Sequence, residues 1–401
     1  MRFYWLLLAF LSISSQAKFM IPGYELVYTT PVETTLTAPD LRGPTSVWCD
    51  LFDQAKQRID IAQFYVSGKA DEPLERVIAH LKAAGERGVK IRFLMDQHGL
   101  SISTPKTLEA LKAIPNLTFN LIDYSHVGGG IIHAKYMVID GQKAYVGSQN
   151  FDWRSLKHIH ETGLLISDLA VVKQLQAIFD IDWHAQQLIA QGKPVLAVRH
   201  HVVLADESHS NYLVASPNNF DPPGVGDSQS ELPRLLAKAK HYARIMVMTY
   251  APLEFSRHHP RPYYHVIDDA IRAAAQRGVK IEMLVSNWNV GEPDIDYLKS
   301  LAVLPNIQIK IVTLPEAKSG FIPYARVMHS KTMDIDGNIA WVGTSNWEGG
   351  YMDNSRNLEV VMQNAKMAKR IGELHQQLWD SQYAKPLVLS EHYPHPHPGK
   401  P

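Results

Sequence analysis

The chain of 401 residues is poor in cysteine and carries no net charge. Cys49 is its one cysteine, which excludes an intramolecular disulfide, and its apolar neighbours place it in the expected core. Forty Lys and Arg balance forty Asp and Glu, so we expect no long basic groove that tracks a nucleic-acid backbone. A pocket that grips one phosphate with local cations is compatible with this balance.

Long apolar runs are also missing. The run Phe3 to Leu11 is much shorter than the roughly 20 residues of a spanning helix. With Arg2 before it and Ser15-Gln-Ala17 after it, it is typical of a secretory signal cleaved after Ala17, the alternative being an uncleaved anchor. We therefore expect residues 1–17 to be removed. The mature protein would then be exported, periplasmic or secreted, without an integral membrane segment.

Metal-ligand spacings are absent as well. The 19 histidines include no His-Glu-x-x-His or similar arrangement, so we expect no metal and no other cofactor. Several histidines fall in the segment 386–401, where they alternate with prolines. Because alternate prolines prevent regular hydrogen bonding, we expect this tail to be disordered and to have no part in catalysis.

The most informative feature is one motif that occurs twice. The first copy has His133, Lys135, Asp140, Gly147, Ser148 and Asn150, and the second has His329, Lys331, Asp336, Gly343, Thr344 and Asn346. Each residue of the second copy lies 196 positions after its partner. Two copies in register make coincidence negligible, and they indicate two half-sites that face each other.

The duplication extends beyond the motif. Residues 83–95 resemble 273–285, and residues 115–122 resemble 305–312. The second half has six extra residues within Leu314 to Pro323, which we expect to shape the rim of the site. Each half has the pattern strand, helix, strand, helix, strand, hairpin and closing helix, which predicts a mixed α/β fold with helices on both faces of each sheet. We expect an N-terminal half at 18–200, a C-terminal half at 201–385, and a bilobed, pseudo-twofold body.

The motif residues can carry out phosphodiester chemistry together. Residues two apart in a strand share a face, so each histidine should lie beside its lysine, while the return strand brings back the hydroxyl and the amide. One imidazole can attack phosphorus and the other can protonate the leaving oxygen. Lysines and neutral donors can stabilise the charge on the oxygens. We therefore expect the histidines, lysines and motif asparagines to be catalytic, and Ser148 and Thr344 to bind substrate.

Two carboxylates and several aromatic residues complete the candidates. Glu161 and Glu359 lie in short apolar strands, where each can hold an imidazole Nδ1–H, the alternative being a solvated strand-edge position. Asp140 and Asp336 precede glycines and are expected to shape turns, with Gly147 and Gly343 also structural. Substrate-side aromatics are expected at the ends of core strands. The candidates are Phe64, Tyr65, Tyr250 and Trp288.

These residues resemble the phospholipase D superfamily, whose motif is His-x-Lys-x4-Asp-x6-Gly-[Ser/Thr]-x-Asn in two copies. The resemblance runs from about Thr45 to Tyr383. The segments 150–156, 322–327 and 343–347 are similar to the branch that contains mammalian lysosomal 5′ exonucleases and poxvirus envelope phospholipases. The resemblance implies a phosphohistidine intermediate and no metal. It also implies that His133 is the nucleophile and His329 the acid. With a single cysteine, the chain departs from lumenal animal members and looks like an exported bacterial homologue.

The resemblance leaves the substrate open, because one fold serves lipases, transphosphatidylases and nucleases. We favour single-stranded nucleic acid attacked from an end, because of the likeness to the exonuclease branch at residues 152–154 and 322–327 and the expected loss of any anchor after Ala17. A single-phosphate pocket needs few cations, which agrees with the zero net charge. The alternative is phospholipase D or transphosphatidylase activity on phospholipid head groups, as in cardiolipin synthases. A non-catalytic phosphate-binding protein is disfavoured because both His–Lys pairs are intact. A zinc hydrolase is disfavoured because the ligand spacing is missing.

Overall fold

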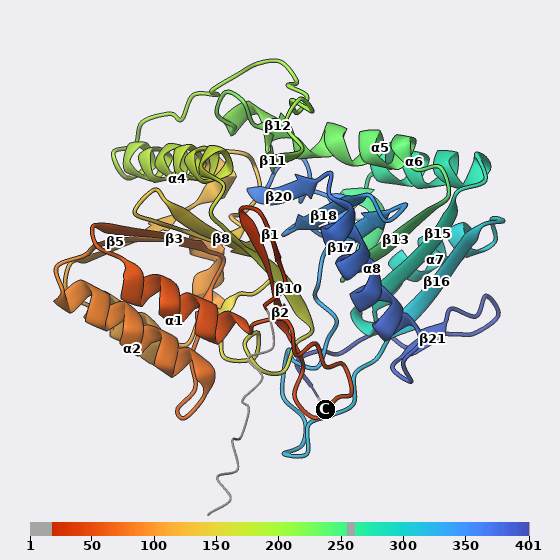
Figure 1. The fold of residues 1–401 in the computed structure, drawn as a ribbon, viewed down its shortest axis with the longest axis horizontal. Helices are drawn as coiled ribbons and strands as arrows, with labels where there is room; N and C mark the ends of the chain where they lie inside the picture. Colours follow the sequence, from red (N-terminus) through yellow and green to blue (C-terminus); the bar gives the residue numbers. More distant parts are fainter. Residues whose placement is uncertain (1–17, 255–260, 401) are drawn as a thin grey trace, which may run out of the picture.

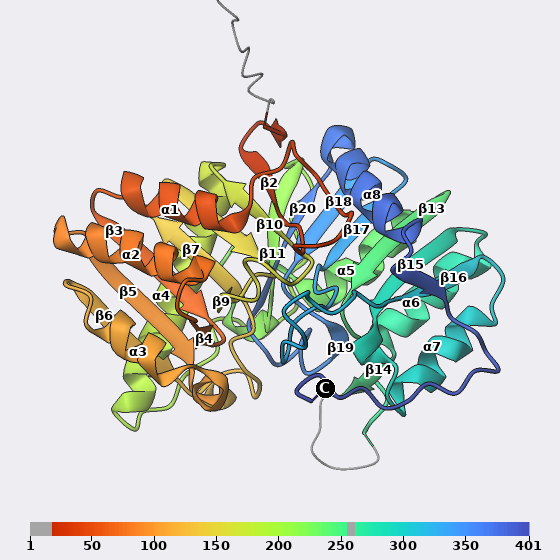
Figure 2. The same cartoon turned by 90° about the horizontal axis from the view of Figure 1, so that it is seen from below.

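The computed structural model describes residues 18–254 and 261–400, and the expected signal lies outside this range. Two mixed sheets lie side by side, one from each half of the chain (Figures 1 and 2). This arrangement confirms the predicted mixed α/β fold built from two similar halves. Within the described residues, no helix is long and apolar enough to cross a membrane.

The N-terminal sheet has eight strands in the order β1-β2-β10-β8-β7-β3-β5-β6. Strands β3, β5 and β6 are parallel, and the others join antiparallel. The strands of this sheet are β1 (Met20–Ile21), β2 (Tyr24–Thr29), β3 (Arg58–Gln63), β5 (Lys90–Asp96), β6 (Leu117–Ile122), β7 (Lys135–Ile139), β8 (Lys143–Gly147) and β10 (Glu161–Ile166). The other elements are α1 (Pro44–Gln54), β4 (Val66–Ser67), α2 (Pro73–Glu86), η1 (Gln97–Ile102), α3 (Pro105–Lys112), η2 (Tyr124–His126), β9 (Phe151–Asp152) and α4 (Leu169–Ala190).

The C-terminal sheet repeats this order, β12-β11-β20-β18-β17-β13-β15-β16-β21. Strands β13, β15 and β16 are parallel, as are β11 and β12 at one edge, and the motif hairpin is β17–β18. The strands are β11 (Asn211–Ser216), β12 (Gly226–Asp227), β13 (Tyr242–Val247), β15 (Lys280–Ser286), β16 (Ile307–Val312), β17 (Thr332–Ile335), β18 (Ile339–Gly343), β20 (Asn357–Met362) and β21 (Ala384–Pro386). The other elements are η3 (Asn218–Phe220), α5 (Ser228–Lys238), β14 (Tyr250–Glu254), α6 (His265–Gln276), η4 (Asn287–Asn289), α7 (Asp294–Ala302), β19 (Trp347–Gly349) and α8 (Ala365–Trp379).

Three apolar clusters hold these layers together. The outer face of the first sheet packs on α1 and α2, and the outer face of the second packs on α5, α6 and α7. The third cluster is shared, because it joins side chains of α4 and α8 to strands of both sheets, for example Val146 and Val342. A core that crosses the boundary fixes the two halves against each other. Cys49 is buried in the first cluster, as expected.

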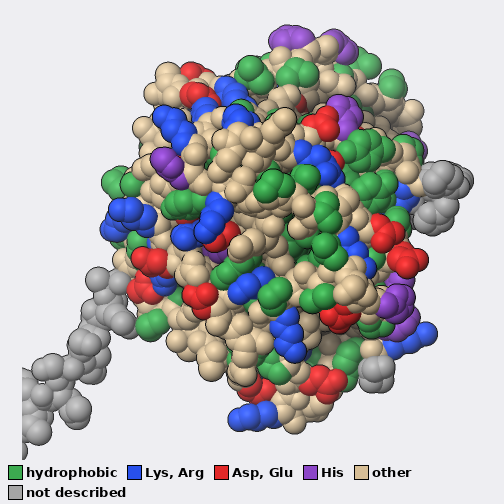
Figure 3. All heavy atoms as spheres, turned by 90° about the vertical axis from the view of Figure 1, so that its right-hand side faces the viewer, with side chains coloured by type: hydrophobic (Ala, Val, Ile, Leu, Met, Phe, Trp, Pro, Cys, Tyr) green, Lys and Arg blue, Asp and Glu red, His purple; other side chains and the backbone are tan. Residues whose placement is uncertain are grey.

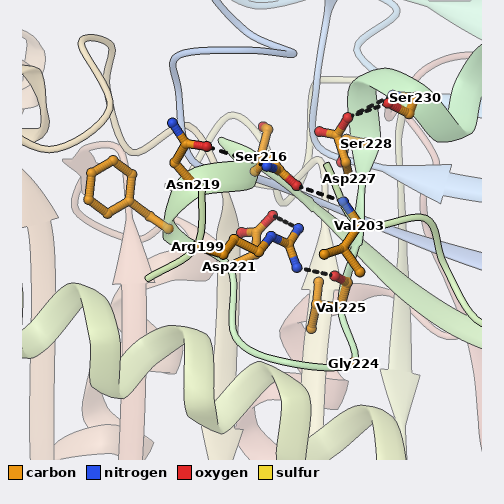
Figure 4. Close-up of polar contacts among 12 residues, drawn as sticks. Arg199, Val203, Ser216, Asn219, Asp221, Gly224, Val225, Asp227, Ser228 and Ser230 are labelled. Carbon is orange, nitrogen blue, oxygen red and sulfur yellow. Dashed lines mark hydrogen bonds and ion pairs between the residues drawn. The ribbon is translucent and has the colours of Figure 1, made fainter. Parts of the chain in front are cut away.

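The segment between α4 and β11 is fastened at Arg199, which is buried although it carries a charge. Its guanidinium donates to the carbonyl of Val225 at 2.7 Å and lies 3.4 Å from the carboxylate of Asp221 (Figure 4). Backbone bonds from Val198 to Asn219 and from Asp227 to Val203 run beside it. The connection between the halves is therefore tied to the loop around η3.

The C-terminal tail lies along the second half, past α7 (Figure 2). Residues 387–400 form no helix or strand, which agrees with their alternate prolines. They nevertheless make specific contacts: Lys299 Nζ donates to the carbonyl of Glu391 at 2.8 Å, and the amide of Tyr324 donates to Pro398. The sequence predicted disorder here and gave no indication of these contacts.

Basic and acidic side chains are mixed on the face shown in Figure 3, with no broad field of one sign. This distribution agrees with the balanced composition.

Candidate active site

A cavity of about 590 Å³ lies between the halves and contains residues of both motif copies. His133 and Asn150 line it from the first copy, and His329 and Asn346 line it from the second. His133 lies two residues before β7 and His329 three residues before β17. Because β7 and β17 pair antiparallel with β3 and β13, the site lies at the carboxyl ends of the parallel strands. Open α/β sheets commonly bind ligands at this edge. The two copies therefore contribute to one cavity.

Each motif histidine is attached to the opposite half through the backbone. The amide of His133 donates to the carbonyl of Arg356 at 3.0 Å, and that of His329 donates to the carbonyl of His160 at 2.9 Å. Arg356 lies 196 positions after His160, so the two bonds are equivalent under the pseudo-twofold. Each half holds the other half's histidine in place.

His133 meets an amide side chain of the other half. Its Nδ1 lies 3.0 Å from Oδ1 of Asn357, the first residue of β20. The orientation of this amide is fixed, because its Nδ2 donates to the carbonyl of Tyr351 at 2.8 Å and its Oδ1 accepts from Thr344 at 2.9 Å. Since the amide oxygen can only accept, Nδ1 of His133 carries the proton and Nε2 keeps its lone pair.

His329 meets a carboxylate of the other half. Its Nδ1 lies 3.3 Å from Oε2 of Glu161, whose Oε1 accepts from Ser155 at 2.7 Å. Burial raises the pKa of Glu161 to about 8. Burial, followed by the charges of Lys331, Lys135 and His133, lowers the pKa of His329 well below its ordinary value. Nδ1 of His329 and Oε2 of Glu161 lie within ion-pair distance but do not form a hydrogen bond in this structure.

The two lysines lie beneath the histidines and are almost completely buried. Lys331 Nζ donates to the carbonyl of His329 at 2.8 Å, and Lys135 Nζ donates to the carbonyl of His133. Burial lowers the pKa of Lys331 to about 7, and burial together with Lys331 lowers that of Lys135 well below its ordinary value. The same burial and both lysines lower the pKa of His133. Because an anion would reverse these shifts, the site is arranged to bind one.

Glu359 was expected to hold the Nδ1–H of a motif histidine, and the structure places it elsewhere. Its carboxylate accepts from Ser345 at 2.7 Å and from Ser228, and burial raises its pKa to about 7. It follows Asn357 by two residues in β20, which places it roughly 6–7 Å further along the strand. Asn357 takes the position next to the histidine. The sequence did hold a signal, because Asn357 follows Asn346 by eleven residues, as Glu161 follows Asn150.

Asp140 and Asp336 have turn geometry that fits their expected structural role. Asp140 accepts three backbone N–H bonds of 2.7–2.8 Å from residues 56–58, and Asp336 accepts three of 2.7–2.9 Å from residues 240–242. Both have φ of 54°, followed by glycines at 64°, as a two-residue hairpin of type I′ requires. At Gly147 and Gly343, a Cβ would come within 2.4 and 2.6 Å of neighbouring atoms, so both positions exclude larger residues.

Only some of the residues expected to contact substrate line the cavity. Phe64, Tyr65 and Trp288 line the cavity. Tyr250 does not fit its expected place, because its ring is fully buried and its hydroxyl donates to Asp268. Ser148 and Thr344 are also fully buried, where their hydroxyls bond to the carbonyl of Thr162 and to Asn357. These two hydroxyls support other groups of the site, whereas the sequence predicted direct contact with substrate.

A buried ion network was not visible in the sequence. Arg356 is fully buried and pairs with Asp182 of α4 at 2.9 Å and with Asp221 at 2.5 Å. Its carbonyl is the one that receives the amide of His133. The sequence around Arg356 gives no indication of these two partners, because they lie 174 and 135 residues away along the chain.

Comparison with known proteins fits this geometry. The family model described as "Cardiolipin synthase, PLD-like domain" matches residues 48–183 and 232–379. The chain belongs to the phospholipase D-like family. It is a phosphodiesterase of that superfamily. The two matched segments correspond to the two sheets and their motif copies.

Relatives of this phospholipase D-like protein include three with long alignments. A 5′-3′ exonuclease PLD3 of Xenopus laevis is 30% identical over 431 residues, covering 94% of this chain and 86% of the relative. A probable phospholipase D of Caenorhabditis elegans is 28% identical over 373 residues, covering 85% of this chain and 66% of that protein. The human 5′-3′ exonuclease PLD3 is 29% identical, with 86% and 76% covered.

Solved structures share the fold at low identity. A phosphatidylserine synthase of Haemophilus influenzae has a TM-score of 0.59 at 13% identity, covering 87% of this chain and 86% of that chain. A polyphosphate kinase of Porphyromonas gingivalis has a TM-score of 0.55 at 14% identity, covering 94% of this chain and 51% of that chain.

Among the described residues, no group of three or more His, Cys, Asp or Glu is placed to hold a metal ion.

Proposed function

We propose that this phosphodiesterase works through a covalent phosphohistidine, with His133 as nucleophile and His329 as general acid. The observation that carries this assignment is the difference between their partners. An amide oxygen beside His133 orients the ring and brings no negative charge to it. A carboxylate beside His329 stabilises the imidazolium that must deliver a proton.

The proposed reaction has two steps, formation and hydrolysis of the phosphohistidine. Nε2 of His133 forms a bond to phosphorus while the bond from phosphorus to the leaving oxygen breaks, and His329 gives its proton to that oxygen. Water then attacks phosphorus, His329 takes a proton from the water, and the bond to His133 breaks. Lys135, Lys331, Asn150 and Asn346 stabilise the charge on the phosphoryl oxygens in both steps.

For the substrate we propose single-stranded nucleic acid cut from an end. Support comes from the relatives that are named 5′-3′ exonucleases and from the aromatic residues Phe64, Tyr65 and Trp288 in the cavity. Stacking on such residues holds any base. Among the described residues that line the cavity, Arg154 is the one lysine or arginine. Few cations at the mouth fit a site that holds an end better than one that tracks a long backbone.

The test compares labelled single strands that are linear or circular, in EDTA, beside vesicles of phosphatidylcholine and phosphatidylglycerol. We expect stepwise release of mononucleotides from the linear strand and resistance of the circular one. Equal cutting of circles would contradict end recognition. Release of lipid head groups alone would support the alternative of a phospholipase D or transphosphatidylase, the activity class in the name of the matching family model. Activity that EDTA abolishes and zinc restores would overturn the mechanism.

We also propose that the protein is exported after cleavage behind Ala17, since Arg2, the short apolar run and Ala17 follow the order of a secretory signal. N-terminal sequencing of the protein recovered from a periplasmic or secreted fraction should begin at Lys18. A sequence that begins at Met1 would contradict cleavage.

A further inference from the structure

A second cavity, of about 530 Å³, adjoins the active-site cavity at Trp288, whose side chain lines both. Its walls come from η4, from the loop between β16 and β17, and from the tail after β21. The loop contains the six-residue insertion of the second half. The volume falls within the range of about 300–1,000 Å³ that small-molecule sites occupy. The cavity is thus large enough for a ligand and shares the side chain of Trp288 with the active-site cavity.

Two polar atoms in the walls of this second cavity lack a hydrogen-bond partner among the described residues. They are Oδ1 of Asn287 and Nη2 of Arg326. Arg326 is only 7% exposed, and its Nε and Nη1 donate to the carbonyls of Pro315 at 2.6 Å and Val32 at 2.7 Å. The guanidinium is therefore held in place with one donor unused. Both atoms have almost no accessible surface, so a ligand pairs with them only when the side chains around them turn. Because a buried polar group without a partner is costly, that pairing gains affinity.

The charged residues of the second cavity are balanced, so they do not favour a phosphate ligand. Arg326 and Lys385 are balanced by Glu316 and Glu391 among its lining residues. The other walls are largely aromatic or apolar, with Trp288, Phe321 and Tyr393 among them. An uncharged, flat ligand with both a donor and an acceptor at its edge suits this combination. Nucleobases have that chemistry, and base stacking on aromatic side chains tolerates any sequence.

We propose that the second cavity binds a nucleobase of the substrate strand, one nucleotide away from the phosphodiester that reacts. The base stacks on Trp288 and Phe321, and its edge pairs with Asn287 and Arg326. This inference rests on the nucleic-acid substrate proposed above and adds a second binding position to it. The site contributes equally to binding of the ground state and the transition state, because it is remote from the reacting atoms.

The test uses Phe321→Ala and Asn287→Ala, with Leu196→Ala as a control because Leu196 is 78% exposed and lies outside both cavities. Each variant is offered hexathymidylate and the p-nitrophenyl ester of thymidine monophosphate, which has a single base. For the hexamer we expect KM to rise roughly 5- to 100-fold in Phe321→Ala with kcat unchanged, and to rise less in Asn287→Ala. For the ester and for the control variant, KM should stay the same.

The outcomes separate the two proposals. If the wild-type protein cleaves neither substrate, the nucleic-acid function fails and the base site falls with it. If it cleaves both and KM for the hexamer is unchanged in Phe321→Ala, the base site alone is wrong. An equal rise in KM for both substrates also overturns the base site, since it would place the effect in the active-site cavity. Thermal melting of each variant verifies that it is folded.

Discussion

Asn357 occupies, next to His133, the position that Glu161 occupies next to His329. Both residues follow their motif asparagine by eleven positions, and both reach across to the histidine of the other half. The pseudo-twofold site is therefore symmetric in its backbone and asymmetric in its chemistry. We propose that this difference assigns the two histidines to different steps.

Replacing Asn357 tests this assignment. In Asn357→Ala we expect kcat to fall by about tenfold or more, because the lost hydrogen bond is worth roughly 1.4 kcal/mol of orientation at the nucleophile. In Asn357→Asp a carboxylate faces His133 and raises its pKa, so the acid limb of kcat/KM should move to higher pH. Asn338→Ala, in an exposed turn, is the control. An acid limb that stays in place in Asn357→Asp would contradict a neutral nucleophile at His133.

The buried lysines are predicted to clamp the phosphoryl oxygens. Lys135→Met or Lys331→Met should lower kcat on the order of 100-fold, since each removes a cation that faces charge in the transition state. Lys193→Met, on the exposed segment after α4, should leave kcat unchanged. Turnover near the wild-type rate in either buried variant, measured on the same substrate, would refute the clamp.

The pH dependence follows from Lys331. Its pKa is lowered to about 7 in the free protein, so kcat/KM should fall as pH rises through about 7 and the cation is lost. A bound phosphodiester is an anion and raises the pKa of the lysine again, so kcat should persist to higher pH than kcat/KM. Rate profiles between pH 4 and 9 measure both. Coincident basic limbs for the two parameters would show that substrate does not restore the proton.

Asp336 is predicted to act on stability. Asp336→Ala removes the acceptor of three backbone N–H bonds at the hairpin, which should lower the free energy of unfolding by roughly 2 kcal/mol. The folded fraction should keep kcat within a few-fold of the wild type. Urea unfolding and single-turnover rates measure the two effects separately. A variant with normal stability and a 100-fold loss of turnover would indicate a catalytic role.

The sequence predicted the architecture well because local patterns govern it. The repeated motif, the alternation of strands and helices, and the Asp–Gly turns each left a periodic signal, and the two mixed sheets follow from them. Between β3 and β4 the chain bends at Phe64 and Tyr65, which line the cavity, and the sequence pattern did not indicate this bend.

The partners within the site were harder to predict because they come from the opposite half. Glu359 was expected beside a histidine, but Asn357, which has the same spacing from Asn346 as Glu161 has from Asn150, lies there. Tyr250 was expected at the substrate because it ends a strand, but its hydroxyl pairs with Asp268 in the core. The place of Asn357 depends on a contact between segments more than a hundred residues apart. The place of Tyr250 depends on its burial in the core. Neither leaves a periodic trace in the sequence.

The central claim is that His133 becomes covalently linked to the phosphoryl group, and trapping this intermediate tests it most directly. His329→Ala, which lacks the proposed acid, is mixed with a ³²P-labelled diester whose p-nitrophenol leaving group needs no protonation. Because water activation by His329 is also lost, the phosphorylated protein should accumulate. After quenching at alkaline pH and digestion, the label should be found in the peptide that contains His133. Label in the peptide that contains residue 329, or rapid turnover without any labelled peptide, would contradict the account.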